Sequence, residues 1–406
     1  MSAIPRYRHH SGPALLSAGF RPFFLLSALW AFAAVPLWLE AYAGGEQLPT
    51  MLPFAVWHAH EMVFGFGAAT VAGFLLTAIP NWTGRMPLQG GPLGLLALLW
   101  ASGRFAVLFS AHIGAIAAAV VDLAFPLLFA AAIARELIAG RNWRNLPVLI
   151  ALTLLFVSNL LVHLSPLGVA DTATVGNRLG IATLLMLVSL IGGRIIPSFT
   201  RNWLAKQRPD LGAPAAFTRF DRAVLGITAV TLALWVAIPD GPLTPWFCIA
   251  AGVAHGVRLG RWRGPATLRE PLLWVLHLGY GWLAFGFCLL GLDALVSWLP
   301  QTTALHALTI GAIGTMTLAV MTRATLGHTG RPLAADVGTT AIYALVSLAT
   351  ILRLIAPLAG EAYVLVLSLS AAAWSGAFGL FVLLYGRALT SSATRPNEPA
   401  SPPRRP

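Results

Sequence analysis

Twelve apolar runs, nearly all long enough to cross a lipid bilayer, follow one another along this chain. A membrane helix needs about 20 mostly apolar residues to cross a hydrocarbon core of about 30 Å. Only 10% of the residues are charged, whereas soluble domains carry about 25%. We therefore predict an all-α, polytopic membrane protein of about 12 transmembrane helices, of which the eighth is the shortest. The expected helices approximately span residues 20–43, 57–80, 91–110, 113–134, 146–165, 177–199, 221–239, 244–258, 271–293, 303–323, 337–358 and 362–386.

The basic residues favour one side of the membrane. The sequence has 26 Lys and Arg residues, and all but Arg104, Arg178, Arg194 and Arg353 fall in alternate connections, starting at the N-terminus. Because positive charge is retained on the cytoplasmic side, we predict that both termini are cytoplasmic. The net charge of +12 is then a consequence of topology, and it does not indicate a nucleic-acid partner.

The chain is predicted to form a single transmembrane domain over residues 1–389. Residues 200–222 are the longest polar interruption and form a cytoplasmic loop between two six-helix halves. The Pro-rich tail 390–406 is expected to be a disordered cytoplasmic segment. Residues 41–43 resemble a signal-peptide cleavage site, but the apolar run before them is longer than the about 7 to 15 residues of a cleaved segment. We therefore expect the first helix to be retained.

An internal repeat relates the second expected helix to the tenth. Residues 60–85 and 306–331 align at a constant offset of 246, with His60 opposite His306. At an offset of 117, the end of the sixth helix matches the end of the second, and Asn177 takes the place of the histidine. These three helices are the second, sixth and tenth in chain order, so they recur at every fourth helix, and they run in the same direction. We therefore predict three pseudo-repeated four-helix units around a central axis.

Histidines near the outer helix ends are candidates for chemistry, because ionisable groups in a bilayer are costly and usually face a site or cavity. In the run WHAHEM at 57–62, His58 and Glu61 are expected to share a helix face, with His60 pointing elsewhere. His163, one turn after Asn159, lies at a similar depth. Imidazole suits iron, copper and zinc, and a carboxylate can orient such a ring. The alternative is a polar rim at the membrane interface.

A second polar layer is expected toward the inner side, and it holds His277, His328, Arg194 and Arg323. Arginine pairs with carboxylates, such as haem propionates, through two parallel hydrogen bonds. The alternative is that arginines of this layer anchor helix ends at the phosphate headgroups of membrane lipid.

Asp122 lies near the middle of the fourth expected helix, and Arg104 on the third is its plausible counter-ion. Such a pair is either a proton relay or a structural clasp. The chain has no P-loop, no dinucleotide-binding glycine motif, no HExxH and no nucleophile elbow. Hydrolysis and ATP-driven transport are therefore poorly supported, which leaves metal-centred redox chemistry or another kind of transport.

Six separated motifs follow one another over nearly the whole chain. They are GFRPFF at 19–24, WHAHEM at 57–62, GRIIPSFTRN at 193–202, HLGY at 277–280, HALT at 306–309 and LGHTGR at 326–331. Together and in this order they resemble the NnrS family. The resemblance implies a multi-pass protein of the bacterial inner membrane that contains haem and copper and is linked to nitric oxide metabolism and nitrosative stress.

The three-unit arrangement is also similar to that of haem-copper oxidases and nitric oxide reductases, as an analogy of architecture. That superfamily has haem histidines near the outer ends of its second and tenth helices. This sequence departs from it in the sixth helix, where Asn177 and Arg178 stand in place of the expected copper-ligand histidine.

We therefore hypothesise a membrane oxidoreductase that binds haem b, with copper or non-haem iron as a second metal, and reduces nitric oxide with electrons from an unidentified donor. The alternatives are a transporter of a metal or nitrosyl-metal complex and a haem sensor without turnover. The expected haem ligands are His60 and His306, the second metal is expected at His58, His163 and Glu61, and the candidates for proton delivery are Glu61 and Asp122.

Overall fold

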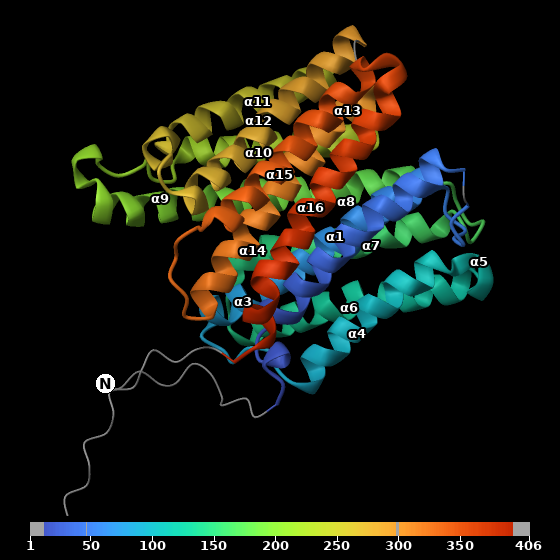
Figure 1. Cartoon of the computed structure of the whole chain (residues 1–406), viewed down its shortest axis with the longest axis horizontal. Coiled ribbons are helices and arrows are strands. Elements are labelled where there is room, and N and C mark those ends of the chain that lie inside the picture. The colour runs from blue at the N-terminus through green and yellow to red at the C-terminus, as the bar shows by residue number, and fades with distance from the viewer. Residues whose placement is uncertain (1–11, 46, 298–299, 393–406) are drawn as a thin grey trace, which may run out of the picture.

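The computed structural model describes residues 12–45, 47–297 and 300–392, and all regular structure in these residues is helical (Figure 1). The membrane-spanning bundle consists of α1 (Phe20–Ala43), α2 (Phe54–His60), η2 (Glu61–Gly67), α3 (Ala68–Thr83), α4 (Gly91–Leu108), α5 (Ser110–Ile113), α6 (Ala115–Ala139), α7 (Leu146–Leu164), α8 (Ala173–Leu187), η4 (Val188–Gly192), α9 (Gly193–Gln207), α10 (Arg219–Ala237), α11 (Thr244–Gly260), α12 (Pro271–Val296), α13 (Gln301–His306), η7 (Ala307–Gly314), α14 (Thr315–His328), α15 (Val337–Ile355) and α16 (Tyr363–Thr390).

The number of membrane spans agrees with the sequence. Eleven helices in the described part of the chain are long and apolar enough to cross a membrane. The remaining expected span, the eighth, corresponds to α11, which has 17 residues and was the shortest in the sequence as well. The chain is therefore an all-helical, multi-pass membrane protein. Of the tail predicted to be disordered, residues 393–406 lie outside the described part.

Successive spans run in opposite directions, so alternate connections lie at the same end of the bundle (Figure 1). We call the end with the arginine-rich connections the basic end. The first and last spans lie side by side and close the bundle. Nε1 of Trp374 on α16 donates to the carbonyl of Ala31 on α1 at 2.9 Å, and Arg21 at the basic end donates to the carbonyls of Ala388 and Leu389.

Three long spans meet at the centre of the bundle, and each contains a π-helical segment. These are the second span (α2, η2, α3), the sixth (α8, η4, α9) and the tenth (α13, η7, α14). At the offset of 246 found in the sequence, Glu61 corresponds to Ala307, and π-helical segments begin at both residues. In the sixth span the offset of 117 leads to Arg178, but the segment begins only at Val188. The π-helical segments of the second and tenth spans thus begin at equivalent positions, whereas that of the sixth span begins ten residues later than the equivalent position.

Candidate functional site

The two histidines of the WHAHEM run face opposite sides of the second span. His58 lines a cavity together with His306, and His60 points into a buried polar cluster. Nδ1 of His60 donates to Oε1 of Glu61 at 2.8 Å, so the expectation that Glu61 lies with His58, on a different face from His60, is wrong. Glu61 directly follows His60 in the chain, and its carboxylate turns toward His60 and toward Nη1 of Arg104 on α4.

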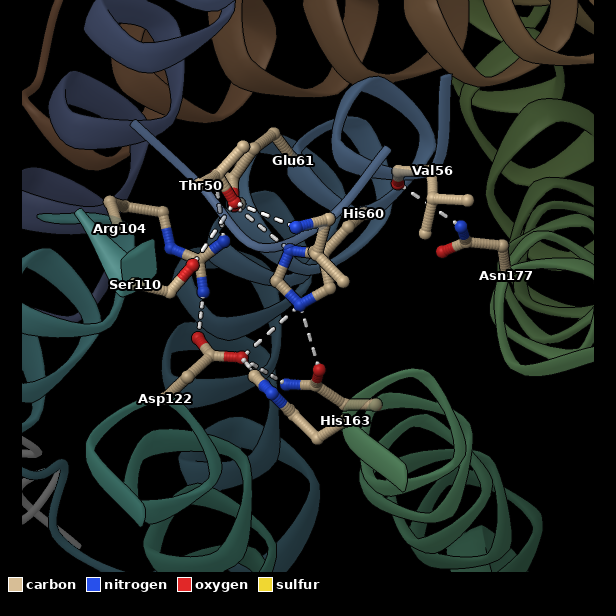
Figure 2. Close-up of polar contacts among 12 residues, drawn as sticks. Thr50, Val56, His60, Glu61, Arg104, Ser110, Asp122, His163 and Asn177 are labelled. Atoms are coloured by element: carbon tan, nitrogen blue, oxygen red, sulfur yellow. Dashed lines mark hydrogen bonds and ion pairs between the residues drawn. The ribbon is translucent and has the colours of Figure 1, made fainter. Parts of the chain in front are cut away.

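The buried cluster gathers its side chains from four spans (Figure 2). Every one of them is at least 97% buried, although the set holds two carboxylates and a guanidinium group. Its members, which we call the polar cluster, are His60 and Glu61 of the second span, Arg104 of α4, Asp122 of α6, and Asn159 and His163 of α7.

Asp122 is the centre of the polar cluster. Its Oδ2 accepts hydrogen bonds from Nδ2 of Asn159 at 2.8 Å and from Nε2 of His163 at 2.9 Å. The same oxygen lies 3.2 Å from Nε2 of His60. Its other oxygen, Oδ1, accepts from Arg104. Two imidazoles and a carboxylate thereby converge, and their ligand atoms all lie within 4.8 Å of one another.

Arg104 joins the two carboxylates of the cluster. Its Nη1 donates to Oε2 of Glu61 at 2.8 Å, and its Nη2 donates to Asp122, so the ion pair predicted between α4 and α6 is confirmed. The helices can approach here because residue 103 is a glycine; a Cβ at Gly103 would lie 2.7 Å from Oδ1 of Asp122. The guanidinium carbon also lies 5.9 Å from the ring centroid of Trp100, which favours the cation further.

The hydrogen bonds of the cluster assign a proton to each nitrogen of His60. Nδ1 faces a carboxylate oxygen of Glu61, and Nε2 faces Oδ1 of Asn159 at 2.9 Å. Because Nδ2 of Asn159 donates to Asp122, its Oδ1 is the acceptor. With His60 as imidazolium, the charges of Glu61, Asp122, Arg104 and His60 sum to zero. A buried cluster of charges must be neutral or nearly so, since an uncompensated charge in a bilayer is costly.

His58 and His306 face each other across a separate space, which we call the histidine cavity. Their ring centroids are 6.5 Å apart and the rings are inclined by 20°. The cavity has an empty volume of about 880 Å³, and most of its wall is apolar. Among the described residues, Nδ1 of His58, Nε1 of Trp38 and Nη1 of Arg353 are buried atoms of this wall without a hydrogen-bond partner.

The orientation of His306 is fixed by its own helix. Nδ1 of His306 donates to the carbonyl oxygen of Thr302, one turn earlier. A backbone carbonyl on one ring nitrogen is the arrangement that leaves the other nitrogen, Nε2, available as a metal ligand. His306 thus has the tautomer that an axial or metal ligand requires.

The residues predicted for the second layer do not gather at one place. Arg323 and His328 line a cavity toward the basic end, which we call the arginine cavity and which has an empty volume of about 1270 Å³. Nη1 of Arg194 donates to Oδ1 of Asn145 at 3.2 Å. Nδ1 of His277 donates to the carbonyl of Leu273 at 3.1 Å within α12. Neither Arg194 nor His277 lines either of these two cavities in the described structure.

Two residues of the histidine cavity were not predicted as part of any site. Arg353 stood out in the sequence as an arginine within an expected helix, and that isolation was the available signal. Trp38 gave no signal, because tryptophan is common at membrane interfaces.

The polar cluster predicts a large difference between two arginine substitutions. Arg104→Met leaves two buried carboxylates with only the imidazolium of His60 to balance them, and it is expected to lower the free energy of unfolding by about 3–5 kcal/mol. Arg85→Met removes an exposed pair with Glu136, Nε to Oε2 2.6 Å, and should cost at most about 1 kcal/mol. Denaturant titration in detergent measures both. Equal effects of the two substitutions would show that the cluster does not depend on the Arg104 charge.

Comparison with known proteins gives one family. Residues 14–392 match the family model described as NnrS protein. No curated protein matches the chain. The match covers nearly all residues, including every span and both sites described above, and it agrees with the motifs found in the sequence. The chain therefore belongs to the NnrS family.

Proposed function

We propose that this chain is a haem- and metal-containing membrane oxidoreductase that removes nitric oxide by reducing it. The observation that carries the proposal is the position of the histidine cavity. Two facing imidazoles and a buried arginine line it, and one of those imidazoles, His58, is separated by a single residue from His60 of a proton-bearing cluster. One turn of the second span thus contributes both to the histidine cavity and to the polar cluster, in which His60 carries a proton.

The residues of the histidine cavity fit a haem. Most of the cavity wall is apolar, which suits a flat macrocycle. The unpartnered nitrogens of His58 and Arg353 are donors or ligands that the protein leaves unused, and such groups are rare in a native interior. Arginine is suited to a propionate through two parallel hydrogen bonds.

We therefore infer that His58 and His306 hold the haem and that Arg353 pairs with its carboxylates. The sequence suggested His60 in place of His58. His60 is less suited to this role, because its ring points into the polar cluster and does not line the histidine cavity. Haem held in this cavity would supply an iron that exchanges electrons with a donor and that binds nitric oxide once one of the two imidazoles leaves it.

The polar cluster fits a second metal, copper or non-haem iron. Nε2 of His60, Nε2 of His163 and Oδ2 of Asp122 are the candidate ligand atoms. Two histidines and one carboxylate form a common ligand set for non-haem iron. Nδ1 of His60 donates to Glu61, which is how ligand histidines are oriented in metal sites. A metal ion there would supply the positive charge that the proton on His60 now supplies, so metal binding would release that proton.

The reduction requires protons as well as electrons. Two molecules of nitric oxide, two electrons and two protons give nitrous oxide and water. The electrons come from a donor that remains to be identified. We infer that Glu61 delivers the protons, because its two carboxylate oxygens contact His60 and Arg104 and its neighbour in the chain, Met62, lines the histidine cavity. Asp122 would hold the side chains of His163 and Asn159 in position by accepting their hydrogen bonds.

We also propose that the protein resides in a bacterial inner membrane with the basic end and both termini in the cytoplasm, as the charge distribution predicts. The histidine cavity and the polar cluster would then lie toward the outer surface. A transporter of a nitrosyl-metal complex and a haem sensor are the competing functions. Neither requires a buried proton store beside the ligand cavity.

Haem content tests the ligand assignment. His58→Ala and His306→Ala should each remove a residue that would hold the haem, and each should abolish or greatly reduce the Soret absorption of the purified protein. His112→Ala is the matched control, because His112 is exposed and lines neither site; it should leave the spectrum unchanged. Full haem content in both cavity variants would contradict the assignment.

Glu61→Gln tests proton delivery. The amide cannot carry the proton, so nitric oxide consumption should fall by about 10²-fold or more, the usual effect of losing a general acid or base, while haem content stays the same. Glu40→Gln, at an exposed position on α1, should have no effect. A nitric oxide electrode gives the rate, and the visible spectrum gives the haem content. An unchanged rate in Glu61→Gln would remove Glu61 from the mechanism.

A further inference from the structure

Three cavities lie in a row along the centre of the bundle. The histidine cavity shares the lining residues Leu184 and Ile313 with a middle cavity of about 590 Å³ empty volume. The middle cavity in turn shares Phe74, Ile195 and Val320 with the arginine cavity. The three cavities therefore adjoin one another in a series from the histidines to the basic end, and we call this series the central passage.

The middle cavity is built only from the three central spans. Each of their π-helical segments contributes to its wall, through Gly67 of η2, Ile191 of η4 and Ile313 of η7. A π-helical turn is wider than an α-helical turn and interrupts regular helix packing. The three distortions thus coincide with the place where the central helices fail to close on one another.

The wall of the middle cavity offers almost nothing to a polar molecule. Its only side chains with oxygen or nitrogen atoms, within the described structure, are Thr70 and Thr317. The hydroxyl of Thr317 donates to the carbonyl of Gly314 at 2.8 Å, and that of Thr70 is engaged with Ser27 and the carbonyl of Phe66. The remaining lining residues are aliphatic, aromatic, methionine or glycine.

Such a wall selects by polarity. A water molecule is held in a protein interior by about two to four polar partners, and apolar cavities without them stay dry. An ion would lose its hydration without replacement, at a cost of several kcal/mol. A small neutral molecule has neither penalty, so only such molecules can cross the middle cavity readily.

We propose that the central passage is a route for small, neutral, apolar molecules to and from the histidine cavity, and that its dry middle segment stops protons and ions. If the proposed function holds, on which this identification of the cargo rests, nitric oxide enters and nitrous oxide leaves along it. Protons take a different path, through the polar cluster. The substrate and the protons of one reaction then reach the same cavity from different sides.

Xenon tests the passage without any cofactor. Crystals of the protein pressurised with xenon should show bound xenon in the middle cavity, since dry apolar cavities take up this gas. Val71→Phe fills the cavity from the second span, and Ile191→Phe fills it from the sixth, so each should abolish that site. Val120→Phe, on the exposed face of α6, is the matched control and should leave it. Absence of xenon from the middle cavity of the unmodified protein would overturn the proposal.

Carbon monoxide tests the route. After photolysis from the reduced haem, rebinding of carbon monoxide from solution should be slower by about tenfold in Val71→Phe and in Ile191→Phe, as for any added barrier of about 1.4 kcal/mol, and unchanged in Val120→Phe. If Val71→Phe and Ile191→Phe no longer bind xenon but rebind carbon monoxide at the unmodified rate, the proposed route is wrong. A protein without haem would instead refute the proposed function, and the xenon experiment would then decide on the passage alone.

Discussion

Charge neutrality inside the bilayer is the constraint on which the polar cluster depends. Glu61 and Asp122 are both buried, and Arg104 supplies one positive charge between them. One more is needed, and the proton on His60 supplies it. The need for this second positive charge also suits the site to a metal ion, because a metal cation and the proton compete for Nε2 of His60. Stability and proposed chemistry therefore rest on the same contacts.

The π-helical segment η2 connects this cluster to the histidine cavity. Glu61 is the first residue of this segment, and its carboxylate contacts His60 and Arg104. Nδ1 of His58 has no partner beside the cavity. The π-helical segment of the tenth span begins directly after His306. π-helical segments thus follow the histidine-bearing turns of both spans, and a third, in the sixth span, lines the middle cavity with them.

The sequence predicted the bundle well because length and apolarity decide whether a helix can span a membrane. Even α11, short in the sequence, is short in the structure. The pair of Arg104 and Asp122 could also be predicted, since two opposite charges within one bilayer rarely stay apart. The partners of His58 and His60 could not, because helix spacing does not decide toward which neighbour the Glu61 carboxylate turns, and the position of Arg104 on α4 is set by tertiary packing. Arg353 was visible as an isolated intramembrane arginine, but its place in the same cavity as His58 depends on how the eleventh span packs against the tenth, and no local pattern encodes that.

The central claim is that the facing histidines hold a redox-active haem that turns over nitric oxide. The most direct measurement is the visible spectrum of the purified protein, reduced by an artificial electron donor and then followed while nitric oxide is added. The account predicts a Soret band that shifts on binding nitric oxide and returns to its reduced position as the gas is consumed. A protein with no Soret band, or one whose nitric oxide complex persists while the donor remains in excess, would contradict it.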